Sequence, residues 1–142
     1  NIADTCINVS SAEGFGLGTL EAMYCGKPII ALKTGGLTRQ VVNCHDGSEN
    51  GVALEPDVQS LVGSQVCPFI LEDRVNTHKI AAAIMRAYEM GPEGRRAVGQ
   101  RAMAYAHQEF DMQEMVSKWD RTLQDLITGW PGKYLPWELR VT

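Results

Sequence analysis

The chain has 142 residues, of which 44% are hydrophobic and 21% charged, a composition typical of one globular domain with its own core. Its formal net charge is −4 and its 13 lysines and arginines are scattered, so a basic nucleic-acid-binding surface is not expected. No apolar run reaches the roughly 18 residues that a membrane helix needs, and the first residues lack the basic start of a signal peptide. These features favour a cytoplasmic protein without a nucleic-acid partner.

The chain starts without methionine, in what reads as the end of one element and the start of a strand. This start predicts a piece of a longer polypeptide. None of its four cysteines, Cys6, Cys25, Cys44 and Cys67, forms a Cys-x-x-Cys pair, so neither a zinc site nor a redox motif is expected. Their mostly apolar surroundings predict buried free thiols in a reducing compartment.

Short apolar or β-branched runs alternate with helical patterns over the first 54 residues. The pattern predicts buried strands over 5–9, 28–32 and 52–54, separated by helices over 17–25 and 37–43. This order favours parallel βαβ units with right-handed crossovers. A doubly wound nucleotide domain usually has about six strands, whereas three or four are found here. We therefore expect an α/β fold with a Rossmann-like half-sheet.

Residues 55–75 contain one apolar run interrupted by Pro68, which predicts either an edge strand or an extended loop, and an insertion near the site. Three helices are expected after it, over 77–90, 92–109 and 111–128. The third carries an apolar stripe that consists of Met112, Met115, Trp119, Leu123, Leu126 and Ile127. The aromatic, proline-rich tail after it is expected to lie against another surface rather than form a long element. We divide the chain into a nucleotide-binding part, 1–110, and a C-terminal helix and tail, 111–142.

The stretch from Glu13 to Glu21 reads E-G-F-G-L-G-T-L-E and lies where a strand passes into a helix. In parallel α/β sheets, ligands bind at this edge. Three glycines let the backbone approach a ligand, and the helix start adds unpaired N–H groups and a positive dipole end, which suits a diphosphate. Glu21 lies about one turn inside the helix and can reach back to a ribose diol, whereas Glu13 is placed for sugar hydroxyls.

Each of these features has an ordinary structural explanation when it is taken alone. A Gly-x-Gly after a strand is common, Glu21 alone would be a solvated helix residue, and Phe15 alone would be a packing residue. The combination of strand, glutamate, glycine-rich turn, helix, second glutamate, strand and Gly-Gly is what favours a phosphate site.

The stretch E-G-F-G-L-G-T-L-E-A-M resembles the signature of two glutamates separated by seven residues in retaining glycosyltransferases of the GT-B fold. C-G-K-P-I-I-A, T-G-G and D-G-S-E-N-G-V-A-L are similar to the next motifs of that family, the last with two residues inserted. The resemblance is close over residues 2–57 and extends in pattern only to about 128. It implies part of the C-terminal domain of a GT-B enzyme.

Carried over to this chain, the resemblance implies a catalytic contact of Glu13 with the donor sugar and a contact of Glu21 with the ribose. Backbone N–H groups around Phe15, Gly16 and Leu17 would hold the distal phosphate. Gly35 and Gly36 would line the opposite wall of the donor cleft. The implied donor-binding set consists of Ser10, Gly14, Phe15, Gly16, Leu17, Glu21, Gly35 and Gly36.

The chain departs from the family at two positions. Val9 stands where proline is frequent, and Arg39 stands where an acid is frequent, so that Arg39 is either a phosphate contact or a surface arginine. The family's basic pair that clamps the diphosphate, and its N-terminal domain, are not found in this sequence. Trp119, Trp130, Tyr134 and Trp137 would, by resemblance, pack toward that missing domain.

The function implied is retaining transfer of a sugar from a nucleoside diphosphate sugar, such as a UDP or GDP sugar, without a metal or other cofactor. The acceptor is an unknown sugar, glycan or lipid. The remainder of the parent polypeptide, or a second copy of the chain, would complete the site, and the fragment alone is expected to be inactive. Two alternatives remain open: a nucleotide-binding module that has lost catalysis, and a GT-B epimerase or phosphorylase.

Overall fold

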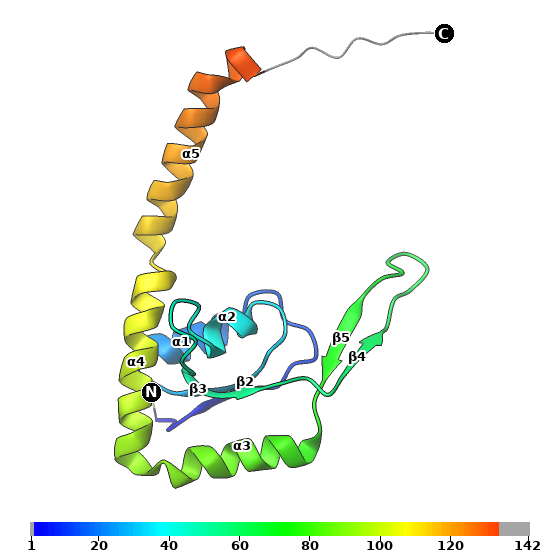
Figure 1. Ribbon diagram of the computed structural model, residues 1–142, viewed down its shortest axis with the longest axis vertical. Helices are drawn as coiled ribbons and strands as arrows, with labels where there is room; N and C mark the ends of the chain where they lie inside the picture. The colour runs from blue at the N-terminus through cyan, green and yellow to red at the C-terminus, as the bar shows by residue number, and fades with distance from the viewer. Residues whose placement is uncertain (1, 134–142) are drawn as a thin grey trace. The chain divides into compact units, whose positions relative to one another are not determined.

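The computed structural model describes residues 2–133, with side chains as far as Trp130 (Figure 1). The chain divides after Glu109 into two compact units, which are described separately below. In this described part, no helix has both the length and the apolar character needed to cross a membrane.

The first unit is built on a three-stranded parallel sheet, which confirms the expected α/β half-sheet. Its strands are β1 (Cys6–Asn8), β2 (Ile29–Leu32) and β3 (Gly51–Leu54), in the order β1-β2-β3. The connections are formed by α1 (Leu17–Tyr24) and α2 (Leu37–Val41), which lie together on one face of the sheet (Figure 1). The elements therefore follow the predicted order, with ends that differ by one or two residues.

Both faces of the central strand β2 are covered, and all four of its residues are buried. Because side chains alternate along a strand, Ile30 and Leu32 face α3 (Thr77–Glu89), while Ile29 and Ala31 face α1 and α2. The cluster beneath α3 consists of Ile30, Leu32, Val52, Leu54, Ala83 and Ala87. This double burial explains why β2 reads as a continuous apolar run.

The face of α3 that packs on the sheet carries small residues. Ala83 and Ala87 are buried and Ile80 packs against them, but Ile84 and Tyr88 are exposed. Small residues at the contact let the helix approach the sheet closely, so the larger side chains turn outward.

The edge strand β1 and the cysteines are more exposed than the sequence predicts. Ile7 in the middle of β1 is 46% exposed, so the expectation of a fully buried strand is wrong. Cys6 is partly buried, and this burial raises the pKa of its thiol. The other three cysteines, Cys25, Cys44 and Cys67, are exposed, and none of the four forms a disulfide in the described residues.

Residues 55–75 form an antiparallel hairpin rather than a strand of the main sheet or an extended loop. Among the described residues, its strands, β4 (Val58–Leu61) and β5 (Leu71–Arg74), pair only with each other. The hairpin belongs to the first unit, and its Asp73 N–H donates a 2.7 Å hydrogen bond to the Ser11 carbonyl. Ser11 belongs to the loop that enters α1, so the segment lies beside the candidate site.

The last helix of the first unit, α4 (Gly91–Glu109), crosses the end of α1 at very short range. A Cβ atom at Gly99 would lie 2.0 Å from the carbonyl oxygen of Gly26, so only glycine allows this contact. Tyr24 adds a 3.3 Å hydrogen bond from its hydroxyl to the Ala106 carbonyl. These contacts fix the C-terminal end of α1.

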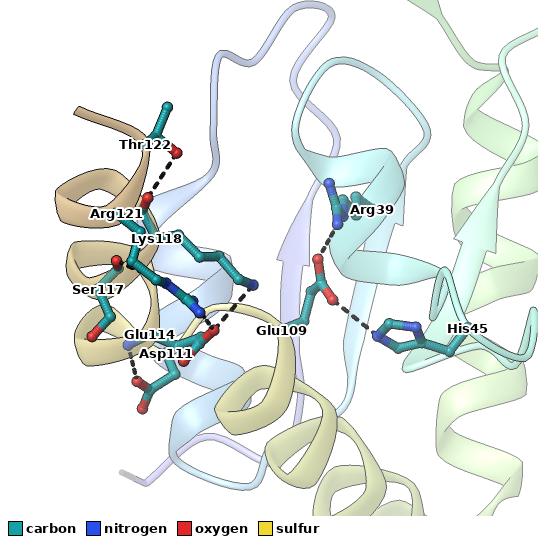
Figure 2. A network of polar contacts seen from close by, with 9 residues as sticks. All are labelled: Arg39, His45, Glu109, Asp111, Glu114, Ser117, Lys118, Arg121 and Thr122. Atoms are coloured by element: carbon teal, nitrogen blue, oxygen red, sulfur yellow. Dashed lines mark hydrogen bonds and ion pairs between the residues drawn. The ribbon is translucent and has the colours of Figure 1, made fainter. Parts of the chain in front are cut away.

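The second unit is the helix α5 (Met112–Lys133). Asp111 starts it as predicted, since its carboxylate accepts a 2.7 Å hydrogen bond from the Glu114 N–H. Glu114 itself pairs with Lys118 and Arg121 on the next turns (Figure 2). The helix continues through 129–133, so the predicted end of this helix at 128 is wrong.

The apolar stripe of α5 is exposed over its described length. The exposed residues are Met112, Met115, Val116, Trp119, Leu123, Leu126, Ile127 and Trp130. Tyr134 and Trp137, the other aromatic residues expected to make contacts, lie outside the described residues.

Candidate functional site

The candidate site is the loop between β1 and α1, which is fixed at its start by the side chain of Asn8. The Asn8 side-chain oxygen accepts a 3.1 Å hydrogen bond from the Ser10 N–H, and its amide donates a 3.3 Å bond to the hydroxyl of Thr19. Asn8 thus joins the end of the strand to the first turn of the helix. Sequence reasoning named Ser10 for this site and missed Asn8.

Gly16 begins α1 in a left-handed conformation, with φ 86° and ψ 53°, and provides no side-chain cap. This conformation favours glycine, and a Cβ atom would also lie 2.5 Å from a methyl carbon of Leu37. The amides of the first helical turn therefore lack the oxygen that a Ser, Thr, Asp or Asn cap supplies. A bound anion is suited to take that place, at the positive end of the helix dipole.

Gly35 and Gly36 support this loop directly with their backbone. The Gly36 N–H lies 3.3 Å from the Glu13 carbonyl oxygen and 3.2 Å from that of Gly14, with hydrogen-bonding geometry to both. A Cβ atom at Gly35 would lie 1.8 Å from the same Glu13 oxygen, and one at Gly36 would lie 2.6 Å from the Cα of Phe15. The Gly-Gly pair is therefore required sterically. Its role as a wall of a donor cleft stays a prediction.

Gln40 supports the loop from α2 and was not singled out from the sequence. Its side chain has no exposed surface, and its amide donates a 2.6 Å hydrogen bond to the Phe15 carbonyl. The other side-chain atom, Oε1, is buried without a hydrogen-bond partner among the described residues. A polar residue between buried Leu37 and Val41 is the one sequence signal that points to Gln40.

The side chains assigned to the ligand lie at or near the surface of this loop. Glu13 is half-buried, Phe15 and Leu17 are exposed, and Glu21 is exposed in α1. Glu21 and Gly18 line a surface cleft together with Cys6 and Lys27. The backbone supports are thus built into the fold, whereas the glutamates are accessible from solvent.

Arg39 lies on α2 next to Gln40 but takes part in a different network. Its guanidinium pairs with Glu109 at the end of α4, and Glu109 also lies 2.9 Å from the ring of His45 (Figure 2). The Glu109 charge and a hydrogen bond with Cys44 raise the pKa of the Arg39 guanidinium. Arg39 is therefore an ion-paired surface arginine in this structure.

Tyr105 anchors the same region from within α4. Its hydroxyl donates a 2.7 Å hydrogen bond to the Arg39 carbonyl and lies 3.5 Å from both the backbone nitrogen and the sulfur of Cys44. Burial is the main cause that raises the pKa of Tyr105 to about 12. Tyr105 thereby holds the C-terminal end of α2, whose N-terminal end carries Gly36.

A glycine-rich loop at the carboxyl edge of a parallel sheet, followed by an uncapped helix start, is the geometry of an anion-binding site in a Rossmann-like domain. Residues 1–65 match the family model described as Glycosyl transferases group 1. The match covers the whole loop and ends inside the β4–β5 hairpin.

Two curated relatives agree with this match over a short segment. The D-inositol 3-phosphate glycosyltransferases of Pseudarthrobacter chlorophenolicus and of Arthrobacter sp. (strain FB24) are each 42% identical over 45 residues. The segment is 32% of this chain and spans only 11% of the length of each relative.

The fold is similar to part of a solved GT-B enzyme. Sucrose-phosphate synthase from Thermosynechococcus elongatus aligns with a TM-score of 0.65 and 24% sequence identity. The alignment covers 89% of this chain and 26% of the synthase chain. The α/β architecture is therefore similar to a portion of the GT-B fold.

Proposed function

We propose that this chain supplies half of the nucleotide-sugar donor site of a retaining glycosyltransferase. The observation that carries the proposal is the start of α1 at Gly16, which has no side-chain cap. Hydrogen bonds from the Gly36 N–H and from the Gln40 side chain support the loop that leads into it. The group 1 glycosyltransferase match over the same residues supports it. The class of ligand that suits this loop is a nucleoside diphosphate sugar.

In this proposal the backbone N–H groups of Phe15, Gly16 and Leu17 face the distal phosphate. Preorganised donors and a helix dipole stabilise the negative charge that grows on the diphosphate as the sugar departs. This electrostatic role would make a metal unnecessary at the loop. Glu21, exposed in α1, would accept hydrogen bonds from the ribose diol, and Glu13 would contact the transferred sugar.

The acceptor and the second half of the site belong, in our proposal, to the rest of a longer polypeptide. The exposed apolar stripe of α5 supports this, since exposed apolar surface of such extent marks an interaction surface. Exposed free thiols at Cys25, Cys44 and Cys67 support a reducing, cytoplasmic location.

A thermal-shift screen of the parent polypeptide tests the donor class. Bound ligand raises apparent stability, so UDP, GDP or ADP, or one of their sugars, is expected to raise the melting temperature more than the corresponding nucleoside. A parent protein that responds equally to nucleoside and nucleoside diphosphate would overturn the phosphate assignment. Product analysis with labelled donor then separates transfer to an acceptor from epimerisation or phosphorolysis.

A further inference from the structure

Three metal-binding side chains meet at a second place in the first unit. The Cys44 sulfur, a ring nitrogen of His45 and a carboxylate oxygen of Glu109 all lie within 4.8 Å of one another. Cys44 and His45 follow the C-terminal end of α2, and Glu109 ends α4. The loop between β1 and α1 contributes no residue to this cluster.

The spacing of these atoms is close to what a zinc ion requires. Zn–S distances of about 2.3 Å and Zn–N or Zn–O distances of about 2.0–2.2 Å place tetrahedral ligands roughly 3.3–3.6 Å apart. His45 Nε2 and Glu109 Oε2 are already 2.9 Å apart. Cys44 and His45 are exposed, so their side chains can turn about an ångström without disturbing a packed core.

The backbone that carries the ligands is well fixed. The Asn43 side chain accepts a 2.9 Å hydrogen bond from the His45 N–H, and the Asn43 carbonyl accepts one of 2.9 Å from Gly47. The Tyr105 hydroxyl lies against Cys44 from α4. Both parts of the cluster are therefore held in place before any ion arrives, which lowers the ordering cost of binding.

Glu109 uses its two oxygens for different partners. Oε1 pairs with Arg39, whereas Oε2 faces His45 (Figure 2). A metal bound through Oε2 leaves the Arg39 pair in place, and such outer partners orient ligating carboxylates.

We propose that Cys44, His45 and Glu109 bind a Zn²⁺ ion, with water as the fourth ligand. A thiolate, an imidazole and a carboxylate are the ligand types that zinc accepts. On binding, the Cys44 thiol gives its proton to solvent and neutral His45 coordinates through Nε2. The ion joins the turn after α2 to the end of α4, which are more than sixty residues apart in sequence. It thereby cross-links two segments of the first unit.

Titration of the purified 142-residue chain with Co²⁺ tests the site, because cobalt replaces zinc and a thiolate ligand gives it a charge-transfer absorption band. We expect one equivalent to bind with this band. Cys44→Ser should abolish the band, and His45→Ala and Glu109→Gln should each weaken affinity at least tenfold. Cys67→Ser, which removes another exposed thiol, is the matched control and should bind cobalt as the unmodified 142-residue chain does.

Two results of the cobalt titration would overturn the proposal: no thiolate-to-cobalt band in the unmodified chain, or a band that survives Cys44→Ser. Zinc binding measured by equilibrium dialysis gives a second readout. Zinc at about a hundredfold above its dissociation constant should raise the melting temperature of the unmodified chain by roughly 5–10 °C. His45→Ala, which changes an exposed side chain, should fold normally by circular dichroism and lose this shift. An equal shift in His45→Ala would show that zinc acts elsewhere.

Discussion

The buried side-chain amide of Gln40 donates a 2.6 Å hydrogen bond to the backbone carbonyl of Phe15, and so joins α2 to the glycine-rich loop. A residue without solvent contact thereby determines the position of a loop that is exposed at Phe15 and Leu17. The loop is held on the side that faces α2 and is open to solvent at Phe15 and Leu17. This is the arrangement that a preorganised anion site needs.

Gln40→Leu, which keeps the side chain's approximate size, should lower the free energy of unfolding by about 1–2 kcal/mol because a buried hydrogen bond is lost. It should also weaken nucleoside-diphosphate binding by the parent polypeptide. Urea unfolding and calorimetric titration measure the two effects. Gln59→Leu, at an exposed glutamine, is the matched control and should change stability by less than about 0.5 kcal/mol. Equal effects of the two variants would remove Gln40 from its supporting role.

Gly36→Ala should destabilise the chain by about 1–3 kcal/mol and distort the donor loop, since the new methyl would overlap Phe15 backbone atoms at 2.6 Å. The backbone at Gly36 is right-handed helical, so the cost is steric alone. At Gly18 a Cβ would meet nothing within 4 Å, and Gly18→Ala should be neutral or stabilising by up to about 1 kcal/mol. Thermal unfolding compares the two variants; a harmless Gly36→Ala would contradict the tight backbone contact.

Glu21→Ala should weaken nucleoside-diphosphate binding by the parent polypeptide about tenfold or more, the value of hydrogen bonds to a charged acceptor. Arg39→Ala should have a smaller effect, because Arg39 pairs with Glu109 in this structure. Calorimetric titration with the best nucleotide of the screen measures both, and Glu93→Ala at another exposed glutamate is the control. A larger effect for Arg39→Ala would overturn the ribose assignment of Glu21.

Tyr105 should make stability depend on pH in alkaline solution. Its folded pKa of about 12 lies above the usual value of 10, so the neutral phenol is favoured in the folded state. The corresponding stabilisation is complete below pH 10 and is lost as the pH rises from 10 through 12, by up to about 1.4 kcal/mol per pH unit. Urea unfolding at pH 9, 10 and 11 should show this loss, and Tyr105→Phe should reduce it. If the stability of Tyr105→Phe falls with pH in parallel with that of the unmodified chain, the raised pKa of Tyr105 is contradicted.

The purified 142-residue chain should show no transfer of labelled sugar from any nucleoside diphosphate donor, because we assign it only half of the site. The parent polypeptide, assayed under the same conditions with candidate acceptors, is the positive control. Turnover by the chain alone would sink this prediction.

The sequence predicts local features of this fold better than contacts between distant segments. The strand–helix order and the glycine-rich loop follow from β-branched runs and from glycines at the turns. The sequence did not predict the β4–β5 hairpin, since its apolar residues, such as Val58 and Leu61, are exposed and its pairing is confined to itself. Apolar flanks also wrongly predicted burial for Cys25 and Cys67.

The candidate site likewise has a part that the sequence predicts and a part that it does not. Glu13, the glycines and Glu21 are adjacent in sequence and form a recognisable motif. Gln40 acts on a carbonyl 25 residues away, and Glu109 lies more than sixty residues from the cysteine and histidine beside it. Such partners become visible only once α2 and α4 are placed on the sheet.

Within the described residues, the strands of the β4–β5 hairpin pair with each other and not with the parallel sheet, while the Asp73 N–H joins the hairpin to Ser11 by a hydrogen bond. The hairpin can therefore be lengthened, shortened or given other residues without altering the register of β1, β2 and β3. The hairpin is therefore a place where protein engineering can vary the border of the loop between β1 and α1, while the packing of α2 against that loop is kept.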